Sequence, residues 1–156
     1  MKTNLEEFIL YGSLGWLRQN VPLSEVVSKI GTPPGQSLRQ GANNPQVGKL
    51  LLSYFDLEVY VTNGLVSGLT LCAWSAKAKL PIEFDLSGFK DPENISVQEI
   101  KSLLNDHEIE WVKDEIMSDK DQLNIVSTND VHFAFDSDKR LTRMGYAPDL
   151  RSIYFK

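Results

Sequence analysis

Two apolar runs on either side of an Asn-Gly pair form the clearest pattern in this chain. They lie in the segment Leu50–Trp74, LLLSYFDLEVYVTNGLVSGLTLCAW. Alternation places one set of side chains on a first face, namely Phe55, Leu57, Val59 and Val61. It places the other set on the second face, namely Tyr54, Asp56, Glu58, Tyr60 and Thr62. Because Asn63-Gly64 suits the two positive-φ positions of a type I′ turn, the segment predicts a β-hairpin.

The second strand of this hairpin contains an irregularity. Strict pairing outward from the turn would place Leu69 and Leu71 opposite acidic residues of the first strand. One extra residue near Ser67-Gly68 returns both leucines to the apolar face, so we predict a β-bulge there.

Polar capping residues predict three helices. The first begins after Asn4, and a second spans Glu25–Ile30 behind a Ser24 cap. The third is expected at residues 97–105, where Ser96 and the glutamate three residues later form a capping box.

The remaining segments predict strands and one long loop. Residues 32–48 are rich in Gly, Pro, Asn and Gln and read as the loop. Further strands are expected at Lys79–Leu86, 109–113, 122–126, 131–135, 140–146 and Ser152–Phe155. At 156 residues the chain has the size of one domain. We therefore expect a single α+β domain over 1–156, with a mostly antiparallel sheet and a few short helices packed on one side.

The order of these elements suggests an internal repeat. Each half reads as a Ser-capped helix followed by antiparallel strands, and VHFAFDSDKRLTRMGY echoes the first hairpin by pattern. Duplication of two related halves, 1–90 and 91–156, is one hypothesis. Independent convergence on strand–turn–strand patterning is the other.

Charge is distributed unevenly along the chain. The net formal charge is −5, and the segment Asn105–Asp121 alone, with seven acids and two lysines, carries the same −5. Overall acidity argues against a nucleic-acid partner, because neutralising phosphates requires clustered Lys and Arg. A basic protein partner would suit this segment better, since opposite charge accelerates association.

The N-terminal segment and the cysteine content indicate the compartment. The apolar stretch Phe8–Leu17 is ten residues long, against the roughly 20 needed to span a bilayer. Lys2 is followed by the acids Glu6 and Glu7, unlike the basic start of a signal peptide. The single cysteine, Cys72, excludes an internal disulfide and a Cys-cluster metal site. We expect a cytoplasmic protein without membrane contact.

One pair of carboxylates has the spacing of a catalytic pair. Asp56 and Glu58, two apart on one strand, would have Cα atoms roughly 7 Å apart, as in inverting glycosidases. Tyr54 and Tyr60 flank them and could stack on a sugar. The alternative is the ordinary solvated face of a half-buried sheet.

Other catalytic and metal-binding signals are weak. His107 and His132 have no partner at a ligand spacing, and both are expected to be exposed. Cys72 has apolar neighbours, and the sequence GTPPGQS lacks the lysine of a phosphate loop. We therefore expect no enzyme activity, cofactor or metal.

The acidic segment is the main interaction signal. Its candidate partner-binding residues are Asp106, Glu108, Glu110, Trp111, Asp114, Glu115, Asp119 and Asp121. Trp111 could anchor an interface, or it could pack inward beneath a solvated charged surface. The tyrosine-bearing hairpin face and the 32–48 loop are further candidate surfaces.

Two quoted segments resemble known bacterial proteins. SEVVSKIGTPPG followed by LLSYFDLEVYVTNGLVSGLTL, within residues 24–74, resembles immunity proteins encoded beside polymorphic or contact-dependent toxins. The resemblance implies an intracellular, non-enzymatic protein that binds and neutralises a toxin domain. The same order of elements is similar to outer-membrane lipoproteins that assist barrel assembly, although Cys72 lies mid-chain. The alternatives are a small carbohydrate-acting hydrolase using Asp56 and Glu58, and a structural accessory subunit.

Overall fold

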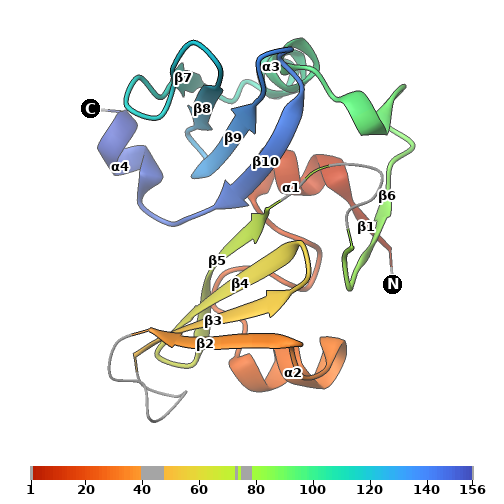
Figure 1. Ribbon diagram of the computed structural model, residues 1–156, viewed down its shortest axis with the longest axis vertical. Coiled ribbons are helices and arrows are strands. Elements are labelled where there is room, and N and C mark those ends of the chain that lie inside the picture. The colour runs from red at the N-terminus through yellow and green to blue at the C-terminus, as the bar shows by residue number, and fades with distance from the viewer. Residues whose placement is uncertain (1, 40–47, 73, 75–78, 156) are drawn as a thin grey trace.

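The computed structural model describes residues 2–39, 48–72, 74 and 79–155 of the chain (Figure 1). The helices are α1 (Leu5–Tyr11), α2 (Leu23–Ile30), α3 (Val97–Asp106) and α4 (Leu150–Tyr154), with a 3-10 turn at Pro92–Asn94. The strands are β1 (Lys2–Asn4), β2 (Gly35–Arg39), β3 (Lys49–Tyr54), β4 (Leu57–Thr62), β5 (Leu65–Leu71), β6 (Glu83–Asp85), β7 (Trp111–Lys113), β8 (Leu123–Ser127), β9 (Val131–Phe135) and β10 (Leu141–Tyr146).

The main sheet has eight antiparallel strands in the order β2-β3-β4-β5-β10-β9-β8-β7. It consists of two meanders, each of four consecutive strands, which appear as the lower and upper halves of Figure 1. Their last strands join them, through the pairs Met144–Leu71, Gly145–Thr70 and Tyr146–Leu69. β1 and β6 form a separate two-stranded parallel sheet. The predicted α+β class with a mostly antiparallel sheet is confirmed.

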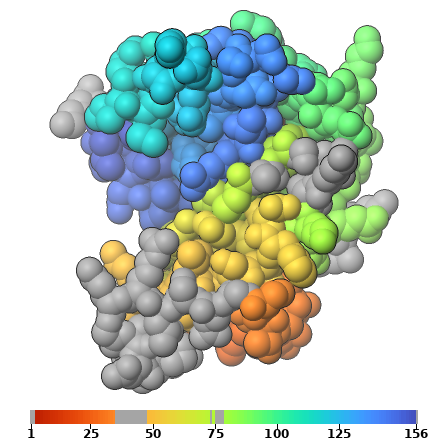
Figure 2. Space-filling view, in the orientation of Figure 1, coloured from red at the N-terminus to blue at the C-terminus, as the bar shows by residue number. Residues whose placement is uncertain are grey.

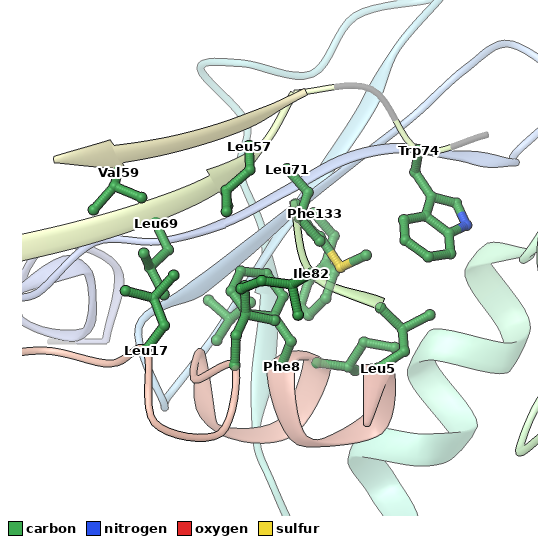
Figure 3. Packing of buried hydrophobic residues seen from close by; sticks show 14 of the residues in the cluster. Leu5, Phe8, Leu17, Leu57, Val59, Leu69, Leu71, Trp74, Ile82 and Phe133 are labelled. Carbon is green, nitrogen blue, oxygen red and sulfur yellow. The ribbon is translucent and has the colours of Figure 1, made fainter. Parts of the chain in front are cut away.

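The core lies between the sheet and the first three helices. Phe8 of α1, Val26 of α2 and Ile100 of α3 are fully buried in one apolar cluster. Leu69 and Phe133 reach this cluster from the two halves of the sheet, above α1 in Figure 3. Burying a side chain of this size contributes about 1.5–3 kcal/mol, so the cluster holds both meanders together.

α4 packs on the opposite face of the sheet from the other helices. Leu150 and Tyr154 of α4 line a hollow with Asn124 and Val126 of β8. These β8 residues alternate with Ile125, which belongs to the core. The expectation of helices on one side therefore holds for α1, α2 and α3, whereas α4 covers one end of the other face, which we call the open face.

The hairpin around Asn63-Gly64 forms as predicted. Both residues have positive φ, 50° and 79°. The β4–β5 register shifts after Tyr60, which pairs with Gly68, because Val61 pairs with Val66. Ser67 is thus the extra residue, and the predicted bulge is confirmed.

The strand that precedes this hairpin is shorter than its pattern indicated. A two-residue turn at Phe55-Asp56 separates β3 from β4, and Phe55 adopts φ 59° with 61% of its surface exposed. Tyr54 pairs with Leu57, so both side chains enter the core. The assignment of Phe55 to the apolar face and Tyr54 to the polar face was wrong. Phe-Asp is not a usual turn pair, so the alternation of apolar and polar residues gives no sign that the strand is interrupted there.

The other predicted elements are confirmed or corrected individually. The capping box of α3 is present, with Ser96 Oγ accepting from the Glu99 N–H and the Glu99 carboxylate accepting from the Ser96 N–H. The Ser24 cap was wrong, since α2 begins earlier, after Pro22. Three further elements differ from expectation. β2 lies inside the predicted 32–48 loop, only β6 forms within Lys79–Leu86, and Ser152–Phe155 contributes to α4 instead of a strand. The rest of the 32–48 loop, residues 40–47, lies outside the described residues.

The repeat hypothesis finds a matching order of elements. A helix followed by a four-stranded meander occurs at residues 23–71 and again at 97–146. The last hairpin of each meander contains a register shift. The two units are closer in length than the predicted halves 1–90 and 91–156, and duplication stays a hypothesis.

Candidate functional site

The acidic segment forms the edge of the sheet around β7. Most of its predicted partner-binding carboxylates are exposed, at the end of α3 or in the loops that flank this strand: Asp106, Glu108, Glu110, Glu115, Asp119 and Asp121. Glu115 forms an ion pair with Lys113 at 3.0 Å. An exposed pair of this kind neutralises little of the surrounding field, so the edge stays negatively charged.

Asp114 differs from the other acids of the segment because only 5% of its surface is exposed. Its Oδ1 accepts from the N–H groups of Ile116 at 3.0 Å and Met117 at 3.1 Å. Its Oδ2 accepts from the Tyr154 hydroxyl of α4 at 2.8 Å. Asp114 therefore ties the β7–β8 loop (residues 114–122) to α4. Its predicted role as an exposed partner contact is corrected to a structural one.

The β7–β8 loop exposes large apolar side chains next to its acids. Ile116 is 87% exposed and Met117 59%, and Ile153 on the adjoining α4 is 60% exposed. Hydrogen bonds within the loop and to β8 stabilise its conformation. Asp119 Oδ1 accepts from the Gln122 N–H at 2.8 Å. Asn124 Nδ2 of β8 donates to the Met117 carbonyl at 2.7 Å. The exposed apolar side chains thus belong to a loop that is braced by these hydrogen bonds. Such a loop loses less conformational entropy when a partner binds.

Trp111 packs against α3. Its Nε1–H donates to Asn105 Oδ1 at 3.0 Å, and the Lys101 ammonium lies 4.3 Å from its ring centroid. The half-buried ring lines a hollow of about 440 Å³ together with Glu108 and Phe155. The hydrogen bond from Nε1–H and the Lys101 ammonium over the ring both hold Trp111 against α3. Its role as an interface anchor stays a prediction.

The predicted second face, with Tyr54, Asp56, Glu58 and Tyr60, is divided by the Phe55-Asp56 turn. Tyr54 is buried and its hydroxyl donates to the Gly31 carbonyl at 2.8 Å. Asp56 lies in the turn, where its carboxylate accepts from the Lys79 N–H at 2.7 Å. Glu58 and Tyr60 alone project from the open face, and the Tyr60 hydroxyl donates to Glu58 at 2.6 Å. The premise of a carboxylate pair on one strand was wrong.

Sequence reasoning missed the middle of the open face. Strand pairing aligns Glu58, Thr70, Gly145 and His132 in one row across β4, β5, β10 and β9. His132 is partly buried, which corrects its expected exposure. Burial, followed by the nearby Arg143 guanidinium, lowers the pKa of His132 to about 4, against a weaker opposing effect of Asp114. Alternation with Val131 and Phe133 indicates the face on which His132 lies, but only the β5–β10 pairing shows what surrounds it.

Cys72 lies on the same face and is a poor nucleophile. Burial, followed by the nearby Glu58 carboxylate, raises the pKa of its thiol to about 11. Thiolate is the reactive form of cysteine, and almost none is present near neutral pH.

The described residues contain neither a candidate metal-binding cluster nor a helix that could span a membrane. There, no three or more His, Cys, Asp or Glu side chains are grouped so that they could hold a metal ion. None of the helices in that part of the chain combines the length and apolarity needed to cross a membrane.

Comparison with models of protein families, with curated proteins and with solved structures found no match to this chain.

Proposed function

We propose that this protein is a non-enzymatic binding protein, an immunity protein of a bacterial toxin system that acts in the cytoplasm. Its partner would be a basic toxin domain that docks on the β7–β8 loop and the adjoining acids. The observation that carries the proposal is the exposure of Ile116 and Met117 on a braced loop flanked by carboxylates.

The composition of this surface suits a protein interface. Interfaces combine an apolar centre, which supplies most of the affinity, with a polar rim that sets specificity and association rate. Ile116 and Met117 would form the centre. Glu115, Asp119 and Asp121 would form the rim and attract a basic partner before contact. The resemblance of residues 24–74 to immunity proteins gives this binding surface its biological context.

The two alternatives are affected differently by the fold. A hydrolase using Asp56 and Glu58 loses its geometric basis, because Asp56 is a turn residue bonded to the Lys79 backbone. A structural accessory subunit would use the same surface and would differ from an immunity protein only in what it binds.

Co-expression with toxin domains encoded beside the gene tests the proposal. We expect a basic toxin domain to lose its toxicity and to bind the wild-type protein. The double variant Ile116→Ser/Met117→Ser should bind at least tenfold more weakly, at roughly 1.4 kcal/mol per factor of ten. Phe55→Ser is the matched control, because it removes an exposed apolar residue from another part of the sheet.

Charge reversal tests the rim separately. Asp119→Lys/Asp121→Lys should slow association at low salt, with a smaller effect at high salt, because salt screens exposed charges. Equal toxin binding by all variants would overturn the proposed surface. Failure of every neighbouring toxin to bind would overturn the immunity assignment.

A further inference from the structure

A hollow of about 430 Å³, lined by both apolar and polar residues, lies on the open face where the two meanders meet. Figure 2 shows the molecule from this side, with the yellow strands of the lower half next to blue β10 and with α1 hidden behind the sheet. The hollow is lined by basic and hydroxyl-bearing side chains, chiefly Lys49, Tyr60, Thr62, Thr70, His132 and Arg143. Among the described residues that line it there is no Asp or Glu, although the chain carries a net charge of −5.

Two glycines, Gly145 and Gly68, lie on the central strands beside this hollow, where neighbouring groups approach the backbone closely. A Cβ at Gly145 would lie 2.5 Å from His132 Nε2 and 2.8 Å from Thr70 Oγ1. A Cβ at Gly68 would lie 2.9 Å from the Tyr146 carbonyl oxygen. The His132 ring and the Thr70 hydroxyl therefore approach Gly145 from its two neighbouring strands. Because neither glycine has a side chain, these groups can pack closely against the central strands beside the hollow.

Three side chains that line the hollow, Arg143, Lys49 and His132, have hydrogen-bonding groups without a partner among the described residues. Within the described residues, the Arg143 guanidinium and the Lys49 ammonium form no hydrogen bond or ion pair, and neither ring nitrogen of His132 has a protein partner. The carboxylate nearest in the cross-strand row, Glu58, accepts from the Tyr60 hydroxyl and is not part of the lining. The lining of the hollow thus presents positive charge, and the nearby Asp114 carboxylate lies outside this lining, in the adjoining hollow near α4.

We propose that this hollow binds the carboxylate or phosphate group of a small organic anion. Arg143 offers the planar donor fork that matches an oxyanion. Lys49, which pairs with Thr62 at the other end of β4, adds a more distant positive charge. The neutral His132 ring can donate one hydrogen bond, and the Tyr60 ring and Pro148 can contact the rest of the ligand. The site is separate from the acidic loop, so it stands independently of the proposed toxin contact.

Nuclear magnetic resonance of the His132 ring tests this site with two probes, inorganic phosphate and succinate. Each is titrated at constant ionic strength, with sodium chloride replaced by probe. We expect the His132 ring signals to shift and saturate with at least one probe. Saturation by phosphate alone would indicate a phosphate-bearing ligand, and saturation by succinate alone a carboxylate.

Matched variants make the result specific. Arg143→Gln should weaken the saturating response at least tenfold, and Lys49→Gln should weaken it less. Arg151→Gln removes an exposed cation outside the hollow and should leave the response unchanged. Backbone amide spectra confirm that each variant is folded. A response that never saturates with either probe, or one that Arg143→Gln leaves intact, would overturn the proposal.

Discussion

Replacing Asp114 should destabilise the end of the sheet around β7 and α4. The carboxylate accepts hydrogen bonds from the Ile116 and Met117 N–H groups and from the Tyr154 hydroxyl. A hydrogen bond to a charged group contributes about 1.5–3 kcal/mol. In Asp114→Ala, part of this free energy is recovered, because the loop N–H groups and the Tyr154 hydroxyl can form hydrogen bonds with water. We therefore expect the free energy of unfolding to fall by about 2–4 kcal/mol.

Urea denaturation followed by circular dichroism measures this loss, with Glu115→Ala as the matched control. Glu115 is adjacent and acidic, but its ion pair with Lys113 is exposed, so its removal should cost below about 1 kcal/mol. Tyr154→Phe should lose about 1 kcal/mol, which isolates the bond to α4. Hydrogen exchange should show faster opening of the β7–β8 loop amides in Asp114→Ala.

The ionisation of Tyr154 gives a second readout of the same contact. The hydrogen bond to Asp114 raises the pKa of Tyr154 above its ordinary value of 10.0, with burial adding to the shift. In Asp114→Asn the pKa of Tyr154 should move back toward that value in a spectroscopic tyrosine titration. Our account of Asp114 would be refuted if Asp114→Ala destabilised the protein no more than Glu115→Ala and left the pKa of Tyr154 unchanged.

Three further predictions concern other parts of the molecule. The pKa of His132 is lowered from 6.5 to about 4, so the unfolded chain binds the proton first. The stability due to the neutral ring is present above pH 6.5 and is lost toward pH 4, by about 3 kcal/mol in denaturation curves. His132→Gln should flatten this dependence, whereas the exposed His107→Gln should not. Ser96→Ala should lower the unfolding free energy by about 1 kcal/mol through loss of the α3 cap, and an unchanged midpoint would contradict the capping role. Alkylation of Cys72 near neutral pH should be about 100-fold slower than that of a free cysteine, and Glu58→Gln should accelerate it. Rapid labelling of the folded wild-type protein would contradict the raised pKa of this thiol.

Local sequence patterns predicted only part of the candidate surfaces. The acidic segment was visible as charge, and most of its carboxylates are exposed. The separate role of Asp114 was not visible, since its hydroxyl donor comes from Tyr154, forty residues further along the chain. The lining of the central hollow was missed for a related reason, because Lys49, His132 and Arg143 belong to strands from both meanders.

Local sequence patterns were sufficient for the elements whose causes are local. The Asn63-Gly64 turn, the bulge at Ser67 and the α3 capping box depend on residues within one turn or one strand pair, so their patterns were sufficient. Tertiary structure decided the pairing of β5 with β10, which joins the two meanders and creates the open face. It also decided that α4 is a helix docked on that face through Asp114. These outcomes depend on contacts between distant segments, whose free energy outweighs the weak local preferences of short stretches.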